Sequence, residues 1–342
     1  MSQPGFWDWE DRQSKLTGNK DLLIRLNQIV DWETFRPRLE QIYDKPRKSQ
    51  AGRKPIDVIV MFKLLVLQQL YNISDEELEY QVSDRLSFMQ FLGFGLADEV
   101  PDATTVWLFR KRLTEQKLIR ALFEEFDTYL IEQGYAAKGG QIVDATLIPV
   151  PKQHNSEDEN QQIKQRQLPP TWQDKPHKRS QKDTDARWTK KGGKSYFGYK
   201  DPICIDAKHG LIRRYAVSDA SVHDSQMLGQ LLDEDNDIDS LWADSAYRSE
   251  AIEETLELRG FDSQIHERAY RNAPLSEEQK QSNRTKSKTR ARVEHVFGRW
   301  VMQMGGKLLR SIGIMRARTQ LGLKNLTYNL IRYTFLKSRS IN

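Results

Sequence analysis

The hydrophobic pattern of the chain changes at Gly139 and Gly140, and this change constrains the fold more than any other feature. Between residues 52 and 133, apolar side chains recur at helical spacing, as in the stripe from Ile56 to Leu70. After the two glycines, residues 141–148 are rich in β-branched side chains, which is typical of a strand. The sequence therefore predicts a helical N-terminal region followed by a domain built on a sheet.

Beyond residue 194, short apolar runs alternate with helical stretches. The expected strands are 195–200, 203–206, 211–217, 239–243 and a run near 264–266, and the expected helices are 223–232, 249–258 and a last region from about residue 288. This order predicts an α/β fold with a mixed sheet and helices packed on it. Residues 151–194 are polar, punctuated by prolines and without apolar periodicity, so we expect a long mobile insertion there.

Composition excludes several classes of protein. Cys204 is the single cysteine, which excludes a disulfide framework and a cysteine-based metal site and fits a reducing cytoplasm. The longest apolar stretch, from Val58 to Leu70, is interrupted by Lys63 and two glutamines, and no basic-then-apolar leader opens the chain, so we expect neither a membrane span nor export. The 53 Lys and Arg exceed the 48 Asp and Glu by only five, so the placement of the basic residues matters more than their number.

Three acidic residues stand out because of their places in the predicted elements. Asp144 lies inside an apolar strand, where an ionised carboxylate needs a compensating cation or hydrogen-bond donors. Asp244 ends the strand 239–243, and α/β sheets commonly place their sites at such strand ends. Glu294 shares a helix face with Arg290, away from the apolar face of that helix. Carboxylate oxygens suit Mg²⁺, and two-metal sites of this kind catalyse phosphoryl transfer.

Each acid also has an ordinary structural interpretation. Asp144 could accept hydrogen bonds from a turn, Asp244 could cap the helix that follows it, and Glu294 could form a turn-to-turn ion pair with Arg290. It is the coincidence of the three acids with a basic segment beside the third that favours a catalytic site.

At these residues the chain resembles the DDE transposases of bacterial insertion sequences, and most closely the insertion-sequence family numbered five. The acids lie in the segments Ile142-Val143-Asp144-Ala145-Thr146, Trp242-Ala243-Asp244-Ser245-Ala246-Tyr247 and Arg290-Ala291-Arg292-Val293-Glu294-His295-Val296-Phe297-Gly298. Their spacings, 100 and 50 residues, suit that family, as do residues 52–55 and the run 185–188 that leads to 194–200. The resemblance covers nearly the whole chain. It implies an RNase H-like catalytic domain in which the three acids hold two Mg²⁺ ions, replaceable by Mn²⁺.

The change of hydrophobic pattern at Gly139 and Gly140 sets the expected domain limits. We expect an N-terminal arm at 1–51, a helical domain for DNA binding or dimerisation at 52–135, and the RNase H-like catalytic domain at 138–342, with the mobile polar insertion at 151–194. Related families carry a Tyr, Arg, Glu and Lys signature around the last acid. Arg290 matches its Arg, but Ser287 and Val301 occupy the Tyr and Lys positions, and Lys307 is a weak candidate for the Lys role.

Basic clusters supply the expected DNA-binding residues. Five cations alternate with uncharged residues beside the third acid: Arg284, Lys286, Lys288, Arg290 and Arg292. The insertion adds cations and an aromatic ring, Arg187, Trp188, Lys190, Lys191 and Lys194, and a solvated loop is the alternative there. Arg53 and Lys54 precede the helical region and favour DNA contact over a solvated linker.

Together these features predict a transposase that cleaves insertion-element ends and transfers the freed 3′ hydroxyl into target DNA. The expected partners are double-stranded DNA, as terminal repeats and as target, and further copies of the chain, as a homodimer or higher assembly on DNA. We expect a cytoplasmic, nucleoid-associated protein without a membrane partner. The alternatives are a metal-dependent nuclease without joining activity and a repurposed, non-catalytic DNA-binding protein.

Overall fold

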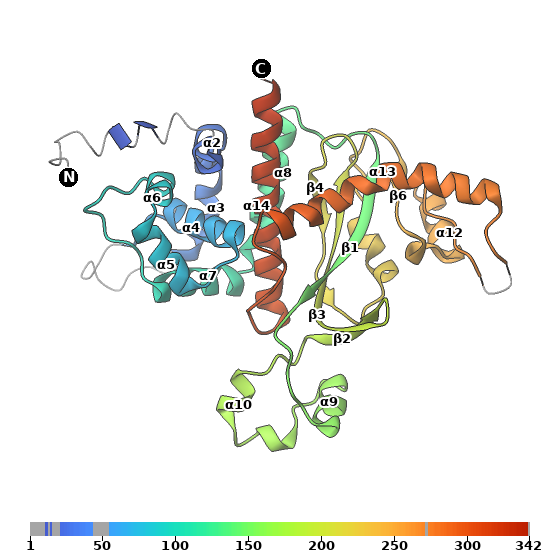
Figure 1. Ribbon diagram of the computed structural model, residues 1–342, viewed down its shortest axis with the longest axis horizontal. Helices are drawn as coiled ribbons and strands as arrows, with labels where there is room; N and C mark the ends of the chain where they lie inside the picture. Colours follow the sequence, from blue (N-terminus) through green and yellow to red (C-terminus); the bar gives the residue numbers. More distant parts are fainter. Residues whose placement is uncertain (1–10, 13, 16–20, 44–54, 271–272, 341–342) are drawn as a thin grey trace, which may run out of the picture. The chain divides into compact units, whose positions relative to one another are not determined.

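The computed structural model describes residues 11–12, 14–15, 21–43, 55–270 and 273–340 (Figure 1). Its contacts divide the chain into two compact units. The first consists of residues 1–134, 303–305 and 323–342, and the second of residues 135–302 and 306–322. In the described part of the chain, no helix is long and apolar enough to cross a membrane.

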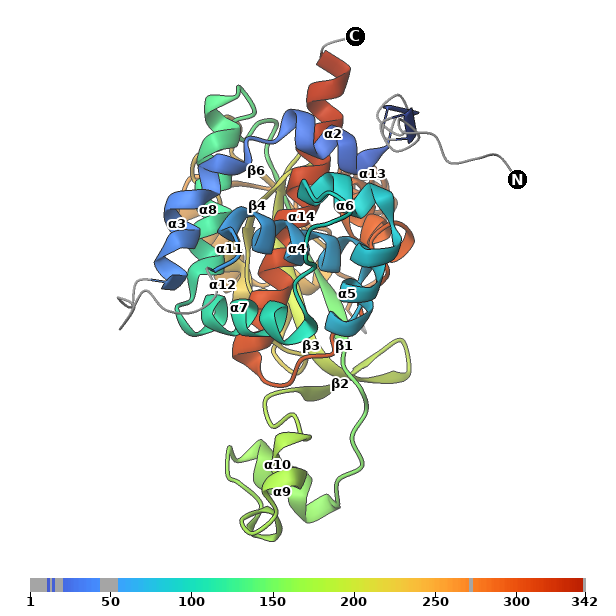
Figure 2. The same ribbon diagram turned by 90° about the vertical axis from the view of Figure 1, so that its left-hand side faces the viewer.

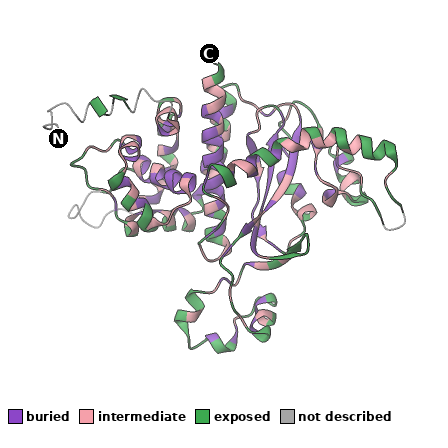
Figure 3. Cartoon of the chain, in the orientation of Figure 1, coloured by how far each residue is buried: buried purple, intermediate pink, exposed green. Residues whose placement is uncertain are grey.

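The first unit is helical, as the sequence predicts for residues 52–133. Its elements are α2 (Leu22–Ile29), η1 (Trp32–Phe35), α3 (Arg36–Glu40), η2 (Gln41–Tyr43), α4 (Val58–Tyr71), α5 (Asp75–Asp84), α6 (Leu86–Leu92), α7 (Ala103–Glu115) and α8 (Leu118–Glu132), joined by the end of α14 (Ile314–Ser340). Side-chain caps fix where helices begin: Ser74 accepts from the Glu77 amide, and Asp102 accepts from the Thr105 amide. Helix α4 is buried along most of its length, so it forms the centre of this unit (Figure 3).

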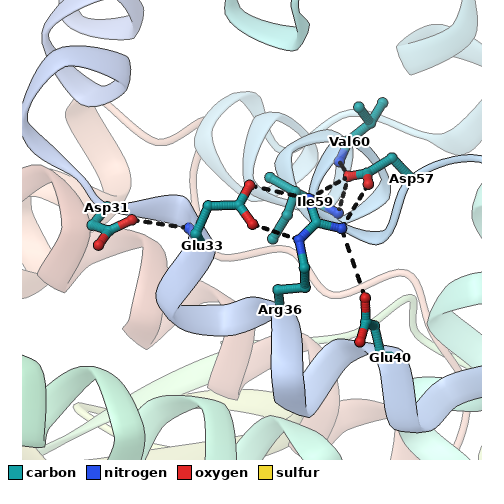
Figure 4. Close-up of polar contacts among 7 residues, drawn as sticks. All are labelled: Asp31, Glu33, Arg36, Glu40, Asp57, Ile59 and Val60. Carbon is teal, nitrogen blue, oxygen red and sulfur yellow. Dashed lines mark hydrogen bonds and ion pairs between the residues drawn. The ribbon is translucent and has the colours of Figure 1, made fainter.

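Residues 21–43 belong to this helical unit, whereas the sequence had suggested an arm ending at residue 51. The Phe35 ring packs on Phe62 and Phe126, with centroids 4.9 and 5.7 Å apart. Arg36 pairs with Glu33 and with Asp57, whose carboxylate lies 2.7 Å away and also caps α4 (Figure 4). These segments are short, so their helical periodicity is weak in the sequence. Buried aromatic rings and ion pairs hold them in place.

The C-terminal boundary also differs from the expected one, because α14 starts in the second unit and ends in the first. Its later residues Leu326, Leu330 and Tyr333 are buried, and the Tyr333 ring packs edge-on against Phe126 and Tyr129. Apolar periodicity predicts such a helix but not which neighbour will cover it. Residues 323–340 therefore group with the helical unit rather than with residues 138–322.

The second unit contains a mixed sheet, which confirms the predicted α/β class. The strands are β1 (Gln141–Pro149), β2 (Arg187–Lys191), β3 (Lys194–Asp206), β4 (Ile212–Tyr215), β5 (Ser218–Asp219), β6 (Ser240–Trp242) and β7 (Asp262–Ser263). Their order is β2-β3-β1-β6-β7, with β4 and β5 also paired to β3. Strand β1 runs antiparallel to β3 and parallel to β6, and β6 runs parallel to β7. This arrangement fits the RNase H-like fold that the resemblance implies.

Helices and a shared apolar core stabilise the sheet. Figure 2 shows the ribbon turned by 90° from the view of Figure 1. The helical elements are η4 (Asp224–Met227), α11 (Leu228–Leu231), η5 (Ser245–Tyr247), α12 (Glu250–Leu258) and α13 (Glu277–Met302). Val143 on β1 packs in a buried cluster with Leu231 and Leu256. Successive strand residues point to opposite faces, so Asp144 points away from that cluster. On α13, Val293, Val296 and Trp300 are buried, and this helix contacts β1 and β6.

Residues 151–194 have more structure than the sequence suggests. They contain α9 (Glu157–Lys164), η3 (Pro170–Trp172), α10 (Pro176–Ser180) and all of β2, which pairs with β3. Ser156 and Glu159 form a capping box, and the Glu159 carboxylate accepts from Trp172 Nε1 and Lys178 Nζ, each at 2.6 Å. Polar side chains therefore organise this segment, which lacks the apolar periodicity on which the sequence prediction relied. Figure 1 shows α9 and α10 set apart from the sheet.

Candidate active site

Asp144 lies near the middle of β1, opposite Ile203 of β3. Its side chain is only 16% exposed and accepts a hydrogen bond from the Ala145 amide at 2.8 Å. Burial raises the pKa of Asp144 to about 6, which outweighs the lowering by the Ala145 amide and by the Arg290 charge, while Asp244 raises it further. The surrounding protein therefore does not fully compensate the negative charge of the ionised Asp144 carboxylate.

Asp244 follows β6, the parallel neighbour of β1. Ile142 pairs with Trp242, so each aspartate lies two residues beyond a paired position on adjacent parallel strands. Asp244 caps η5 by accepting from the Ala246 amide at 2.8 Å, as its ordinary interpretation predicts. Because its charge raises the pKa of Asp144, the two carboxylates are also electrostatically coupled. A capping role and a place in a site therefore coexist at this residue.

Helix α13 brings the third acid towards the first through one guanidinium. Arg290 Nη1 lies 2.9 Å from Asp144 Oδ2, and Arg290 Nη2 lies 2.7 Å from Glu294 Oε1. The pair between Arg290 and Glu294 is the turn-to-turn contact expected from their spacing. The contact with Asp144 joins residues 146 positions apart and is not foreseeable from helical spacing. Glu294 remains 57% exposed, so it lies at the open side of the site.

The three acids, Asp144, Asp244 and Glu294, have some of the features that a divalent cation site needs. Carboxylate oxygens are the ligands preferred by Mg²⁺, and the raised pKa of the buried Asp144 means that its ionised form lacks sufficient positive charge nearby. Within the described ranges, no group of three or more His, Cys, Asp or Glu residues is arranged to hold a metal ion. Arg290 contributes a positive charge between Asp144 and Glu294. Asp144 and Glu294 therefore each offer a carboxylate that Arg290 already contacts, so a metal ion there would compete with that guanidinium.

Lys307 reaches the same region from the loop after α13. Its ammonium donates to Thr146 Oγ1 at 2.6 Å, and Thr146 lies two residues after Asp144 on the same face of β1. Burial lowers the pKa of Lys307, and the nearby Lys191 charge lowers it further, while Asp144 opposes the shift. Val301, which occupies the signature lysine position, is 52% exposed. The structure thus brings Lys307 into the neighbourhood of Asp144.

Two further residues near the acids escaped the sequence analysis. The Tyr247 hydroxyl is buried, with no hydrogen-bond partner within the described residues. Burial raises its pKa, and the Asp224, Asp144 and Asp244 charges add to that shift. The His266 pKa is lowered by burial and by Arg290, and its Nε2 lies 3.3 Å from Ser287 Oγ. The only sequence signal for Tyr247 was its place three residues after Asp244.

The basic residues of α13 fall into two groups. Lys286 donates to the Ile265 carbonyl at 3.0 Å, and Arg292 donates to the Ala207 carbonyl. Together with Arg290 they are engaged by the protein itself. Arg284 and Lys288 are exposed, and the Arg284 side chain lies 3.4 Å from Gln281 Oε1. Fewer basic side chains of this helix are therefore free to reach a ligand than the sequence suggests.

The cations predicted in the insertion also divide in this way. Arg187 donates to the carbonyls of Thr184, Ala186 and Ile163, so it supports the local fold. Lys190, Lys191 and Lys194 are exposed on the β2-β3 hairpin, and the 43% exposed Trp188 packs on Phe197. Arg53 and Lys54 lie outside the described residues.

Comparisons with known proteins agree along most of the chain. A family model described as the transposase DDE domain matches residues 135–330, and a second, described as a transposase domain (DUF772), matches residues 10–112. Among solved structures, the chain is similar to the cryo-EM structure of a piggyBac transposase synaptic complex with hairpin DNA. The two chains share 12% identity with a TM-score of 0.47, over 96% of this chain and 78% of that one.

Proposed function

The chain belongs to the DDE transposase family, and from that premise we propose that it cleaves the ends of an insertion element and joins each freed 3′ hydroxyl to target DNA. Membership implies a DNA-cleaving and strand-transferring enzyme that depends on a divalent metal. Our finer proposals are membership of the insertion-sequence family numbered five, two Mg²⁺ ions as the metal, replaceable by Mn²⁺, and double-stranded DNA bound by a homodimer or higher assembly.

One observation carries the assignment of the site. Asp144 and Asp244 lie at equivalent places on adjacent parallel strands, and Arg290 links Asp144 to Glu294 across the sheet–helix boundary. Acids 100 and 50 residues apart in sequence are thus linked in the second unit, Glu294 to Asp144 through Arg290 and Asp244 to Asp144 through the effect of its charge. This convergence supports Asp144, Asp244 and Glu294 as the metal ligands and catalytic residues.

In the proposed reaction, Asp144, Asp244 and Glu294 would hold the metal, and Arg290 frees Asp144 and Glu294 for this role by turning from their carboxylates to a DNA phosphate. The bound metal supplies the charge stabilisation and nucleophile activation that phosphoryl transfer needs. Arg290 can place a planar guanidinium on a phosphate next to the cleaved bond, because its bidentate geometry matches phosphate oxygens as well as carboxylates. One site serves both steps, since hydrolysis and joining differ only in whether water or a DNA hydroxyl attacks in line.

DNA binding is assigned to cations that the protein leaves exposed. On α13 these are Arg284 and Lys288, and on the hairpin they are Lys190, Lys191 and Lys194, beside Trp188. Each neutralised phosphate releases counterions, so such residues provide sequence-independent affinity. Arg187, Lys286 and Arg292 contribute by positioning the segments that carry these cations, since they donate to backbone carbonyls.

A strand-resolved assay tests the proposal. The full-length protein is incubated with Mg²⁺ and either an intact or a pre-cleaved duplex carrying an element end, together with target plasmid. We expect nicking of the first substrate and joining of the second, and neither in Asp144→Asn. Nicking without joining would favour a nuclease. Binding without either reaction would favour a non-catalytic DNA-binding protein.

A further inference from the structure

A hollow of about 720 Å³ lies in the second unit, lined by residues of the insertion, β5, η4 and the start of α14. Leu168, Val222 and Met227 contribute apolar wall, and Arg166, Arg179 and Arg318 contribute cationic side chains from three separate segments. Sites of this size hold small molecules or single residues of a polymer. The mixture of apolar wall and cations is suited to an amphipathic anion.

The positive charge of this hollow is not neutralised by the protein. None of Arg166, Arg179 and Arg318 pairs with a carboxylate within the described residues, and all three are exposed. The lining carries more basic than acidic side chains, because Lys182 and Arg187 join these three arginines against only Asp185 and Asp219. The remaining potential is therefore positive and favours an anionic ligand.

A buried polar atom provides a second, independent observation. Ser218 lines the hollow, is only 8% exposed, and its hydroxyl has no hydrogen-bond partner within the described residues. A buried hydroxyl left unpaired costs free energy, and in native proteins such groups usually find a partner. A polar group of a bound ligand would satisfy it.

The hollow is separate from the candidate active site. Ser218 pairs with Lys200 of β3, which in turn pairs with Leu147 of β1. Cross-strand partners point to the same face, and Leu147 is three residues from Asp144, so these two side chains point to opposite faces of the sheet. None of Asp144, Asp244 and Glu294 lines the hollow, so a ligand there would not contact the acids proposed for cleavage.

We propose that this hollow binds one unpaired nucleotide of a DNA strand, with its phosphate on the arginines and its base against the apolar wall. This proposal depends on the proposed function in one respect, which is that the ligand is DNA. A duplex is too wide to enter a space of this volume, whereas a single nucleotide offers an anion, polar edges for Ser218 and an apolar face for Met227.

The test measures binding of a fluorescein-labelled oligothymidylate to the full-length protein in EDTA, so that no cleavage step is involved. The pocket variant combines Arg166→Ala with Arg318→Ala. The matched control combines Lys164→Ala with Lys175→Ala, two exposed cations of the same insertion that do not line the hollow. We expect about tenfold or more weaker binding in the first and less than about threefold in the second. Equal losses, or none, would overturn the proposal.

A second pair of variants changes the charge of the hollow's lining without removing any basic side chain. Gln230 is exposed and lines the hollow, so Gln230→Glu adds a negative charge there while Gln230→Met does not. We expect only the glutamate to weaken binding. An oligonucleotide carrying 5-iodouracil should crosslink to residues 163–187 or 217–230. Crosslinks only elsewhere would refute the site, and the Mg²⁺-dependent cleavage results would stand independently.

Discussion

The strand half and the helix half of the candidate active site are held by different means. Asp144 lies on β1 and Asp244 lies just beyond β6. Each carboxylate accepts a hydrogen bond from a backbone amide, Asp144 from Ala145 and Asp244 from Ala246. Glu294 is contacted by the Arg290 side chain and is 57% exposed, against 16% for Asp144. The first half is built into the sheet, whereas the second depends on long side chains.

This difference indicates which parts of the site can rearrange. Moving either aspartate would disturb the hydrogen bonds of the sheet or of η5. Turning Arg290 away from Asp144 requires only side-chain rotation, although it leaves a poorly compensated buried carboxylate behind. In the proposed site, the strand half would fix where the reaction occurs, and the position of Arg290 would determine whether Asp144 and Glu294 are free to bind a cation.

The largest expected effect comes from removing the acids. Asp144→Asn, Asp244→Asn and Glu294→Gln should each lower Mg²⁺-dependent cleavage of an end-containing duplex by about 10³-fold or more, because each removes a proposed metal ligand and transition-state charge stabilisation. End binding should persist, since Lys and Arg provide most of it. Glu257→Gln, which neutralises an exposed carboxylate on α12, serves as the control. Full activity in any acid variant would remove that residue from the site.

A stability measurement isolates the strand half. The Asp144 pKa is raised by burial from 3.8 to about 6, so the native state holds this proton more tightly than the unfolded state. Stability from this group is present below pH 4 and is lost as the pH rises to about 6, a loss of about 3 kcal/mol. In EDTA, the unfolding free energy of Asp144→Asn relative to wild type should rise across that window. A pH-independent difference would mean that Arg290 compensates the charge fully.

Arg290 probes the helix half. Arg290→Ala should lower turnover at saturating DNA by about 10²-fold, and Arg290→Lys should recover only part of it, since an ammonium cannot bind phosphate in bidentate fashion. Arg284→Ala, on the same helix and exposed, is the matched control and should affect affinity alone. If Arg290 were merely a surface partner of Glu294, worth about 0.2–0.5 kcal/mol, turnover would stay near wild type.

The sequence predicted the strand half better than the helix half. The β-branched run 141–148 placed Asp144 inside a strand, and the strand 239–243 placed Asp244 at a strand end, and backbone geometry then determines which way they point. The contact of Arg290 with Asp144 arises from packing of α13 on β1, and helical spacing predicts only its contact with Glu294. Partners that are distant in sequence leave no local pattern.

Charge was the least reliable guide. The sequence shows that Arg187, Lys286 and Arg292 are basic, but not that each donates to a backbone carbonyl. Likewise, residues 151–194 appeared structureless because Glu159 organises them through a buried polar network rather than through an apolar face. The basic side chains available to DNA are those that make no such contacts within the protein. Only the tertiary structure shows which ones they are.

The smallest expected effect distinguishes two neighbouring lysines of α13. Lys288 is exposed, so Lys288→Ala should weaken binding similarly for matched and mismatched end sequences and lower the salt slope by about 0.9 if it contacts one phosphate. The Lys286 side chain is 12% exposed and shares the Ile265 carbonyl with Arg248, so Lys286→Ala should remove one of these two hydrogen bonds and lower the unfolding free energy by about 0.5–1.5 kcal/mol. Salt titrations of binding and denaturant unfolding of both variants separate these outcomes. A salt-slope change in Lys286→Ala equal to that in Lys288→Ala, without loss of stability, would show that Lys286 leaves its carbonyl partner to bind DNA.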